Sequence, residues 1–243
     1  IVCFVVSRKA RGQGIAAALL DAAIEYARAH GATTLEAYPV DVADFDSCQR
    51  CVERVTEEIA PVDILVNNAG ITRDMTFRKM TKADWDAVLR TNLDSVFNMT
   101  KQVCDGMADR GWGRIIFISS ESGVRIPAEM VHYGVTKTAQ LALSRGIAES
   151  VAGTGVTANA VLPGPTRSEG VEEFVGKLAD DQGADLENFK RDFVKTMRPS
   201  SLIGRFAETK EVANLVVFLC GEGSSAITGA SLRVDGGVVR SIV

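Results

Sequence analysis

The chain has 243 residues, of which 46% are hydrophobic, and a formal net charge of −4. This size suits one α/β domain with a large core, and the charge offers no electrostatic footprint for nucleic acid or an anionic membrane surface. No apolar stretch approaches the roughly 18 residues that a membrane span needs, and none resembles a signal peptide. We therefore expect a cytoplasmic protein without a membrane or nucleic-acid partner.

Short apolar runs alternate with amphipathic stretches along the chain. Strands are predicted at residues 2–6, 34–39, 63–66, 114–119, 156–162 and 231–234, and helices at 15–30, 46–59, 82–109, 131–152 and 210–219. Such alternation predicts an α/β fold, a doubly wound, Rossmann-like parallel sheet in a single domain. Residues 165–208 carry helical patterns at 171–178 and 186–197, so we interpret them as a helical substrate lid.

The five cysteines are scattered and odd in number, which favours reduced thiols over a disulfide framework. Cys48 and Cys51 have a spacing found in metal and redox sites. They lie inside an amphipathic helical pattern with no second pair of ligands nearby, so no metal site is predicted.

Three chemically complementary side chains follow the strand at 114–119. Ser120 comes at the carboxyl end of that strand, where open α/β sheets bind ligands. Tyr133 and Lys137 are four residues apart and share one face of the next predicted helix. A positive charge stabilises tyrosinate, so Lys137 is expected to lower the pKa of Tyr133. This combination predicts general acid chemistry at a carbonyl that becomes an alcohol.

The order of the surrounding motifs narrows the interpretation. Asn67-Asn68-Ala69-Gly70 follows an apolar strand, Asn92 lies in the next helix, and Pro163-Gly164 follows a later strand. Together with Ser120, Tyr133 and Lys137, this set strongly resembles the short-chain dehydrogenase/reductase family over about residues 41 to 243.

The resemblance implies hydride transfer between NADP(H) and a ketone or secondary alcohol, with NAD as a possible alternative cofactor. The implied catalytic residues are Asn92, Ser120, Tyr133 and Lys137, and in the family the asparagine supports a water between its backbone carbonyl and the lysine. The implied cofactor-binding residues are Asp41, Val42, Asn67, Ala69, Gly70, Tyr133, Lys137, Pro163, Gly164 and Ser168.

The stretch from Gly70 to residue 109 resembles acetoacetyl-CoA reductases, which suggests a 3-oxoacyl thioester substrate. Val234-Asp235-Gly236-Gly237 matches the closing strand and turn that commonly pack at a tetramer interface in the family. We therefore expect a homo-tetramer or dimer.

The first 40 residues support two interpretations. Ser7, Gly12 and Gly14 fit a phosphate-binding loop between a strand and a helix, with Arg11 favouring NADP, but Arg8 replaces the first glycine. Residues 11–16 equally resemble the acetyl-CoA loop of GNAT N-acetyltransferases. The stretch between Gly14 and Asp41 is one strand-helix unit shorter than in a complete reductase. We therefore expect a chimera with an acetyltransferase-like start at 1–40.

Two alternatives to an active reductase remain open. A folded but inactive relic would keep the catalytic residues without a competent dinucleotide site. A CoA-binding module would use residues 11–16 as a working pyrophosphate loop.

Overall fold

A five-stranded parallel sheet forms the centre of the computed structural model, which describes residues 2–4, 36–167, 175, 192 and 194–242. Its strands lie in the order β1-β2-β3-β4-β7, and every neighbouring pair is parallel. Their bounds are β1 Val2–Phe4, β2 Ile64–Asn67, β3 Gly113–Ile118, β4 Val156–Pro163 and β7 Ser231–Val234. The predicted parallel α/β sheet is confirmed.

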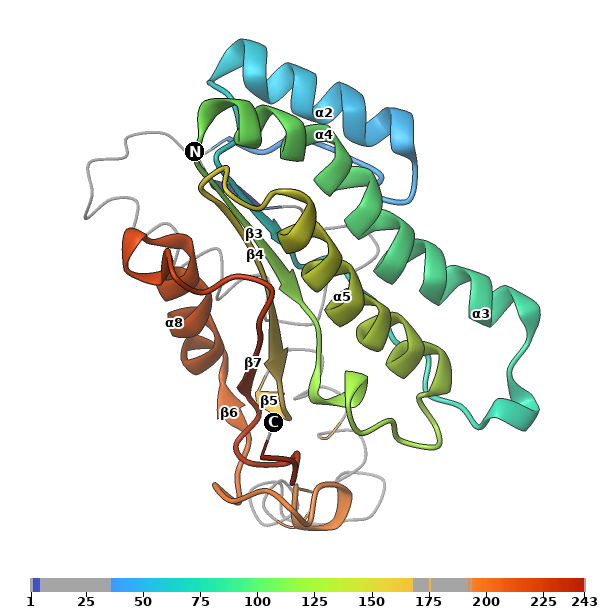
Figure 1. Cartoon of the computed structure of the whole chain (residues 1–243). Helices are drawn as coiled ribbons and strands as arrows, with labels where there is room; N and C mark the ends of the chain where they lie inside the picture. Colours follow the sequence, from blue (N-terminus) through green and yellow to red (C-terminus); the bar gives the residue numbers. More distant parts are fainter. Residues whose placement is uncertain (1, 5–35, 168–174, 176–191, 193, 243) are drawn as a thin grey trace.

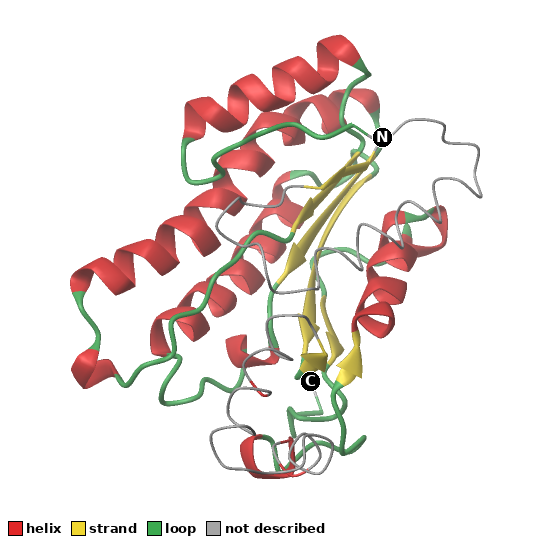
Figure 2. Cartoon of the chain, turned by 180° about the vertical axis from the view of Figure 1, so that it is seen from behind, coloured by secondary structure: helices red, strands yellow, loops and turns green. Residues whose placement is uncertain are grey.

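Helices cover both faces of this sheet (Figure 1). On one face lie α2 (Phe45–Glu58), α3 (Lys82–Leu89), α4 (Ser95–Arg110) and α5 (Val131–Ser150), and on the other α8 (Thr209–Cys220). The view from behind shows the strands between these two groups of helices (Figure 2). Short elements complete the description: η1 Phe77–Lys79, η2 Arg90–Asp94, η3 Glu121–Gly123, η4 Glu222–Ser224, and β5 Thr166–Arg167 paired with β6 Ala207–Glu208.

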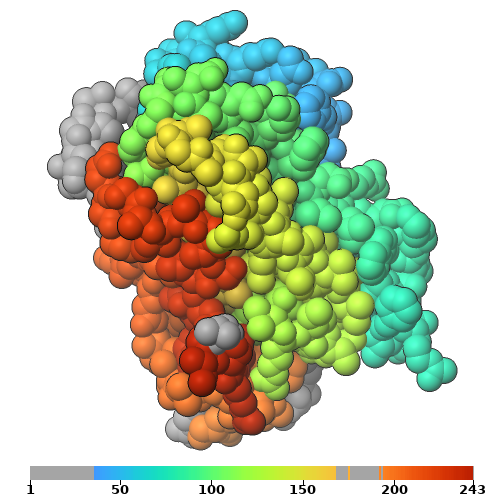
Figure 3. All heavy atoms as spheres, viewed as in Figure 1, coloured from blue at the N-terminus to red at the C-terminus, as the bar shows by residue number. Residues whose placement is uncertain are grey.

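Strand β3 is the buried axis of the fold. All six of its residues are buried, and Ile115, Ile116 and Phe117 have no exposed surface. Side chains of this kind each contribute about 1.5–3 kcal/mol when fully buried. Ile115 and Phe117 pack in the cluster under α2, α4 and α5, whereas Ile116 packs under α8. In the space-filling view, α4, α5 and α8 hide most of the sheet (Figure 3).

Helix ends follow ordinary capping chemistry. Asp44 accepts a hydrogen bond from Ser47 N at the start of α2, and Thr81 and Asp84 form a capping box at the start of α3. Gly111 ends α4 with a φ of 75°, a left-handed conformation that glycine adopts without strain.

The predicted helix at 82–109 is interrupted. A π turn at Arg90–Asp94 separates α3 from α4. A π turn inserts one residue into the helix and leaves a backbone carbonyl without its usual partner, and such turns are frequent at functional sites. The carbonyl of Asn92, in the middle of this turn, accepts a side-chain hydrogen bond instead.

The predicted strand at 34–39 is wrong over its described part. Residues 36–40 have no regular structure. Pro39 has no N–H to give to a ladder, and Tyr38 and Val40 pack against the core beneath α2. Because residues 5–35 lie outside the described part, the shortage of one strand-helix unit stays a prediction.

The predicted lid is described only in part. Asp192 and residues 194–197 are helical, and Val175, Val194 and Phe206 form a small apolar cluster. Most of the helix predicted at 171–178 lies outside the described residues. Among the described helices, none combines the length and apolar character that crossing a membrane requires.

Candidate active site

Two neighbouring strands end in polar residues at the same edge of the sheet. Asn67 ends β2, Ser119 and Ser120 directly follow β3, and all three side chains are buried. Ser119 Oγ donates a 2.8 Å hydrogen bond to the carbonyl of Lys137, which ties this strand end to α5. The carboxyl edge of the sheet is where open α/β folds place their ligands.

The most buried face of α5 is polar. Its buried side chains include His132, Thr136, Lys137, Gln140 and Ser144. Lys137 Nζ lies 5.4 Å from the centroid of the Tyr133 ring, as the spacing of four residues predicts. The helix therefore presents a phenol and an amine side by side to the end of β3.

Lys137 is held without a carboxylate partner among the described residues. Its Nζ donates to the carbonyl of Ile118 at 2.6 Å and to Gln140 Oε1 at 3.4 Å. Burial lowers the pKa of Lys137 from the ordinary 10.5 to about 7. The ammonium charge is therefore lost close to neutral pH.

The pKa of Tyr133 does not follow the sequence prediction. It is raised from its ordinary value, first by burial and then by the negative charge of Glu121, while a hydrogen bond with Ser120 opposes the rise. The expected lowering by Lys137 is wrong, because desolvation outweighs the effect of an amine whose own charge is weakened. Tyr133 is consequently a protonated phenol at neutral pH and can act as an acid.

Asn92 clamps the turn that follows β2. Its side chain is fully buried, accepts from Ile71 N at 2.8 Å and donates to Ile71 O at 2.9 Å. A further bond runs from Asn92 Nδ2 to Thr136 Oγ1 at 3.2 Å. Asn92 thus joins the π turn, the Gly70-Ile71 turn and α5, a role that sequence reasoning did not foresee.

Gly70 lies against the centre of this arrangement. A Cβ atom added there would stand 3.5 Å from Asn92 Oδ1 and 3.6 Å from Lys137 Nζ. The backbone turn after β2 therefore passes directly beside the catalytic candidates.

Gln140 also belongs to the site, although the sequence analysis did not select it. Its side chain has no exposed surface, and its Nε2 donates a 2.6 Å hydrogen bond to the carbonyl of Asn92. The available signal was a polar residue seven positions after Tyr133, on the face that carries Lys137.

A buried carboxylate lies next to Ser120 and was also missed. Ser120 and Ser122 each donate a hydroxyl hydrogen bond of 2.8 Å to Glu121 Oε2. Arg198 Nε donates to Glu121 Oε1 at 2.7 Å, and both charged side chains are largely buried. Arg198 lies within the predicted lid, so the ion pair links that segment to the turn that follows β3.

The remaining described candidates lie at strand ends, in the turn after β2, or beside α2 and α4. Asn67 Nδ2 donates to Thr100 Oγ1 at 3.1 Å, and Ala69 is buried. Asp41 is exposed, whereas Val42 is buried. The carbonyl of Val42 accepts a 3.0 Å hydrogen bond from Asn98 Nδ2. The remaining described pair, Pro163 and Gly164, lies at the end of β4.

Glycine is required at position 164, because an added Cβ would come within 2.5 Å of the Asp235 carbonyl. The predicted residues Ser7, Arg11, Gly12, Gly14 and Ser168 lie outside the described part of the chain.

The described residues fit the nicotinamide half of a dinucleotide. In its charged form Lys137 has three hydrogens to donate and two acceptors among the described residues, which leaves one donor for a ribose hydroxyl. Gly70 places no side chain beside that donor.

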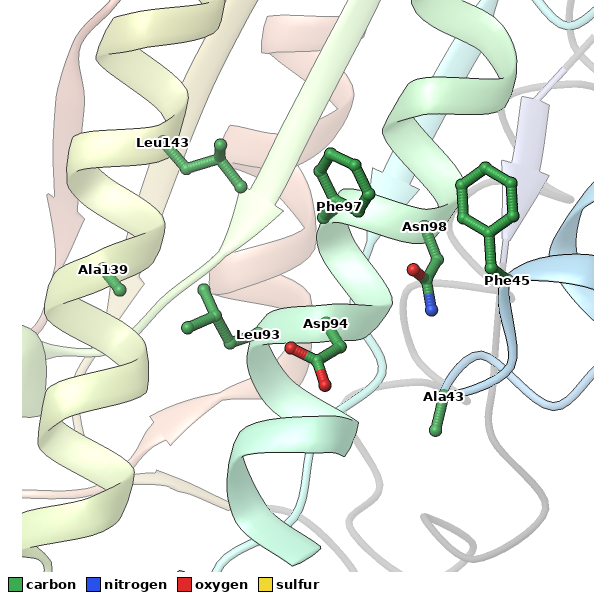
Figure 4. A pocket seen from close by; sticks show the side chains of 8 residues that line it. All are labelled: Ala43, Phe45, Leu93, Asp94, Phe97, Asn98, Ala139 and Leu143. Atoms are coloured by element: carbon green, nitrogen blue, oxygen red, sulfur yellow. The ribbon is translucent and has the colours of Figure 1, made fainter. Parts of the chain in front are cut away.

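A separate hollow of about 500 Å³ lies on the outer side of α4 and α5 (Figure 4). Phe45, Phe97 and Leu143 line it, and the two phenylalanine rings lie 6.3 Å apart. None of its lining residues is a candidate catalytic residue, so this hollow is distinct from the site around Tyr133.

Comparison with known proteins agrees with this geometry. The family model described as "Enoyl-(Acyl carrier protein) reductase" matches residues 4–239. The uncharacterized oxidoreductase YvrD of Bacillus subtilis is 40% identical over 217 residues, covering 89% of this chain and 80% of the relative. Acetoacetyl-CoA reductase of Cupriavidus necator is 40% identical over 198 residues, covering 82% of this chain and 74% of the relative.

A solved structure is similar over nearly the whole chain. L-sorbose reductase from Gluconobacter frateurii, complexed with NADPH and L-sorbose, has a TM-score of 0.85 at 26% identity and covers 95% of this chain and 94% of its own. The similarity in fold therefore extends well beyond the residues at the carboxyl edge of the sheet.

The acetyltransferase-like start is not supported. The family match begins at residue 4, and β1 pairs in parallel with β2, the strand that ends in Asn67. A short strand before a loop with two glycines is common to both families, which explains why the first 40 residues alone were ambiguous. From its family match and its relatives, the chain belongs to the short-chain dehydrogenase/reductase family and is an oxidoreductase.

Proposed function

We propose that the protein reduces a ketone to a secondary alcohol with NADPH, and that the substrate is a 3-oxoacyl thioester of the acetoacetyl-CoA type. The observation that carries this proposal is the convergence of Ser120, Tyr133, Lys137 and Asn92 at one sheet edge. A protonated phenol beside an amine, at the end of a buried strand, suits proton delivery to a carbonyl oxygen.

Each side chain has a separate task in this proposal. Tyr133 donates its phenolic proton to the carbonyl oxygen as that oxygen gains negative charge. Lys137 then stabilises the tyrosinate, and its third hydrogen would bind a hydroxyl of the nicotinamide ribose. The Ser120 hydroxyl, which donates to Glu121 Oε2, would hold the substrate oxygen. The bound nicotinamide supplies the hydride.

The cofactor assignment rests on the described half of the site and on the comparisons. Lys137, Gly70 and Gly164 would hold the nicotinamide side, and Asp41, Val42 and Asn67 the adenosine side. L-sorbose reductase, a fold relative over 95% of this chain, was solved with NADPH. Arg11 just before Gly12 favours NADP over NAD, although both residues lie outside the described part.

The substrate class is supported by the relatives. The acetoacetyl-CoA reductase of Cupriavidus necator shares 40% of its residues with this chain over 198 positions. The predicted lid at 165–208, whose Arg198 contacts Glu121, is where selection among ketones would occur. A homo-tetramer or dimer and a cytoplasmic location stay predictions.

A spectrophotometric assay tests the proposal. Purified protein with NADPH and acetoacetyl-CoA should lose absorbance at the nicotinamide band and form a 3-hydroxyacyl product. Tyr133→Phe should lower kcat by a factor of about 100 or more, the usual contribution of a positioned general acid. Near-normal turnover in this variant would remove Tyr133 from its role.

The two alternatives give different results in the same experiment. An inactive relic would fold yet fail to bind NADPH in a fluorescence titration. A CoA-binding module would bind CoA alone without any nicotinamide-dependent reaction.

A further inference from the structure

Gln140 of α5 connects the π turn to Lys137. Gln140 is fully buried, its Nε2 donates to the Asn92 carbonyl at 2.6 Å, and its Oε1 accepts from Lys137 Nζ at 3.4 Å. The orientation of the amide follows from its partners, because a carbonyl can only accept and an ammonium can only donate. One side chain therefore spans the distance between the turn and the amine.

This arrangement differs from the family pattern expected from the sequence. That pattern has a water between the asparagine carbonyl and the lysine, whereas here the Gln140 side chain contacts both the Asn92 carbonyl and Lys137 Nζ directly. A π turn interrupts the regular helical hydrogen-bond ladder, and a buried carbonyl without a partner destabilises the fold. The amide of Gln140 satisfies the carbonyl and meets Lys137 with its other end.

We propose that Gln140 is a positioning residue of the active site, whose side-chain amide joins the Asn92 carbonyl to Lys137 and fixes Lys137 between the π turn and the end of β3. The inference deepens the proposed function, since it concerns the amine that serves Tyr133. Gln140 acts on Lys137 whether or not cofactor and substrate are bound. Its role can therefore be tested without turnover.

The surroundings make Lys137 sensitive to this contact. Among the described residues, the titratable side chain beside it is Tyr133 on the same helix, and the charges that act on Tyr133 are Glu121, which is paired with Arg198, and Asp74. Its two acceptors are neutral oxygens, those of Ile118 and Gln140. Each acceptor favours the charged amine, so removal of Gln140 Oε1 should lower the pKa of Lys137 further from about 7.

Three substitutions separate a polar bridge from simple packing. Gln140→Met keeps the volume and removes both hydrogen bonds. Gln140→Ala removes volume but leaves room for a water between two polar partners. Gln140→Glu keeps the shape and adds a negative charge beside the amine, which should raise the pKa of Lys137.

The primary readout is nuclear magnetic resonance of ¹³C-lysine-labelled, ligand-free protein between pH 5 and 9. The signal that titrates near neutrality is assigned to Lys137 by its loss in Lys137→Met. We expect Gln140→Met to move this titration down by about half to one pH unit, Gln140→Ala to leave it nearly in place, and Gln140→Glu to move it up. Gln102→Met, a change at a glutamine of α4 outside the site, is the matched control and should not move it.

Kinetics provide the second readout. We expect kcat to fall roughly tenfold in Gln140→Met, the usual effect of losing an outer partner of a reactive group. Gln140→Ala should retain more activity than Gln140→Met. The reverse order, with an unmoved titration in both variants, would show that Gln140 only fills space and would overturn the proposal. An inactive wild type with the expected titration shifts would count against the proposed reaction while leaving Gln140 in its assigned role.

Discussion

Replacement of Lys137 by methionine should change the way stability depends on pH. Folding lowers the pKa of this amine from 10.5 to about 7 through burial. Between these two values the unfolded chain binds one more proton than the native protein, so the free energy of unfolding rises with pH in that window. Below pH 7 the native protein carries a desolvated charge at Lys137. The contribution of Lys137 to the free energy of unfolding is therefore lowest there.

The magnitude follows from the linkage relation. Each pKa unit corresponds to about 1.4 kcal/mol, so the wild type should gain about 2.5 kcal/mol relative to Lys137→Met between pH 6 and pH 9. Methionine has a similar length and no charge, and all other titrating groups are shared by both proteins and cancel in the difference.

Urea denaturation of both proteins at several pH values measures this difference directly. Lys101→Met is the matched control, because Lys101 is an exposed lysine paired with Asp105, and its difference curve should be flat over this range. A flat curve for Lys137→Met as well would refute the reasoning, since it would show that Lys137 is not desolvated in the native protein.

Two further predictions concern the turns beside the site. Gly70→Ala should leave thermal stability unchanged or slightly higher, because the new methyl group meets Asn92 and Lys137 at ordinary contact distances. The same variant should bind NADPH more weakly in a fluorescence titration. Unchanged affinity would place the nicotinamide elsewhere. Glu121→Gln should lower the free energy of unfolding by about 1–3 kcal/mol in urea denaturation, because it breaks a largely buried ion pair with Arg198. Glu149→Gln is the control, because Glu149 forms an exposed ion pair with Arg145. It should lower the free energy of unfolding by less than about 0.5 kcal/mol.

The sheet and the positions of Ser120, Tyr133 and Lys137 could be predicted because each depends on local pattern. The apolar run of β3 fixes where the strand ends, and a spacing of four places Tyr133 and Lys137 on one helix face. Parallel strands then bring their carboxyl ends together. These are consequences of periodicity, which a single sequence displays.

The π turn could not be predicted, and the missed residues depend on it. One inserted residue does not disturb an amphipathic pattern enough to be seen, so residues 82–109 read as one helix. The partner of Gln140 is a backbone carbonyl 48 positions away, and that of Glu121 is Arg198, 77 positions away. Only the folded chain brings these pairs together. The pKa of Tyr133 was also mispredicted, because burial outweighs a neighbouring amine that burial itself tends to neutralise.

Tracing the hydride tests the central claim most directly. Protein incubated with acetoacetyl-CoA and NADPH carrying deuterium at the transferable C4 position should give a 3-hydroxyacyl product one mass unit heavier, with the deuterium on the carbon that bore the ketone. Tyr133→Phe should form this product at least about 100 times more slowly. A product without deuterium, or equal rates in the two proteins, would contradict the proposal that this site reduces a ketone by hydride transfer with Tyr133 as the acid.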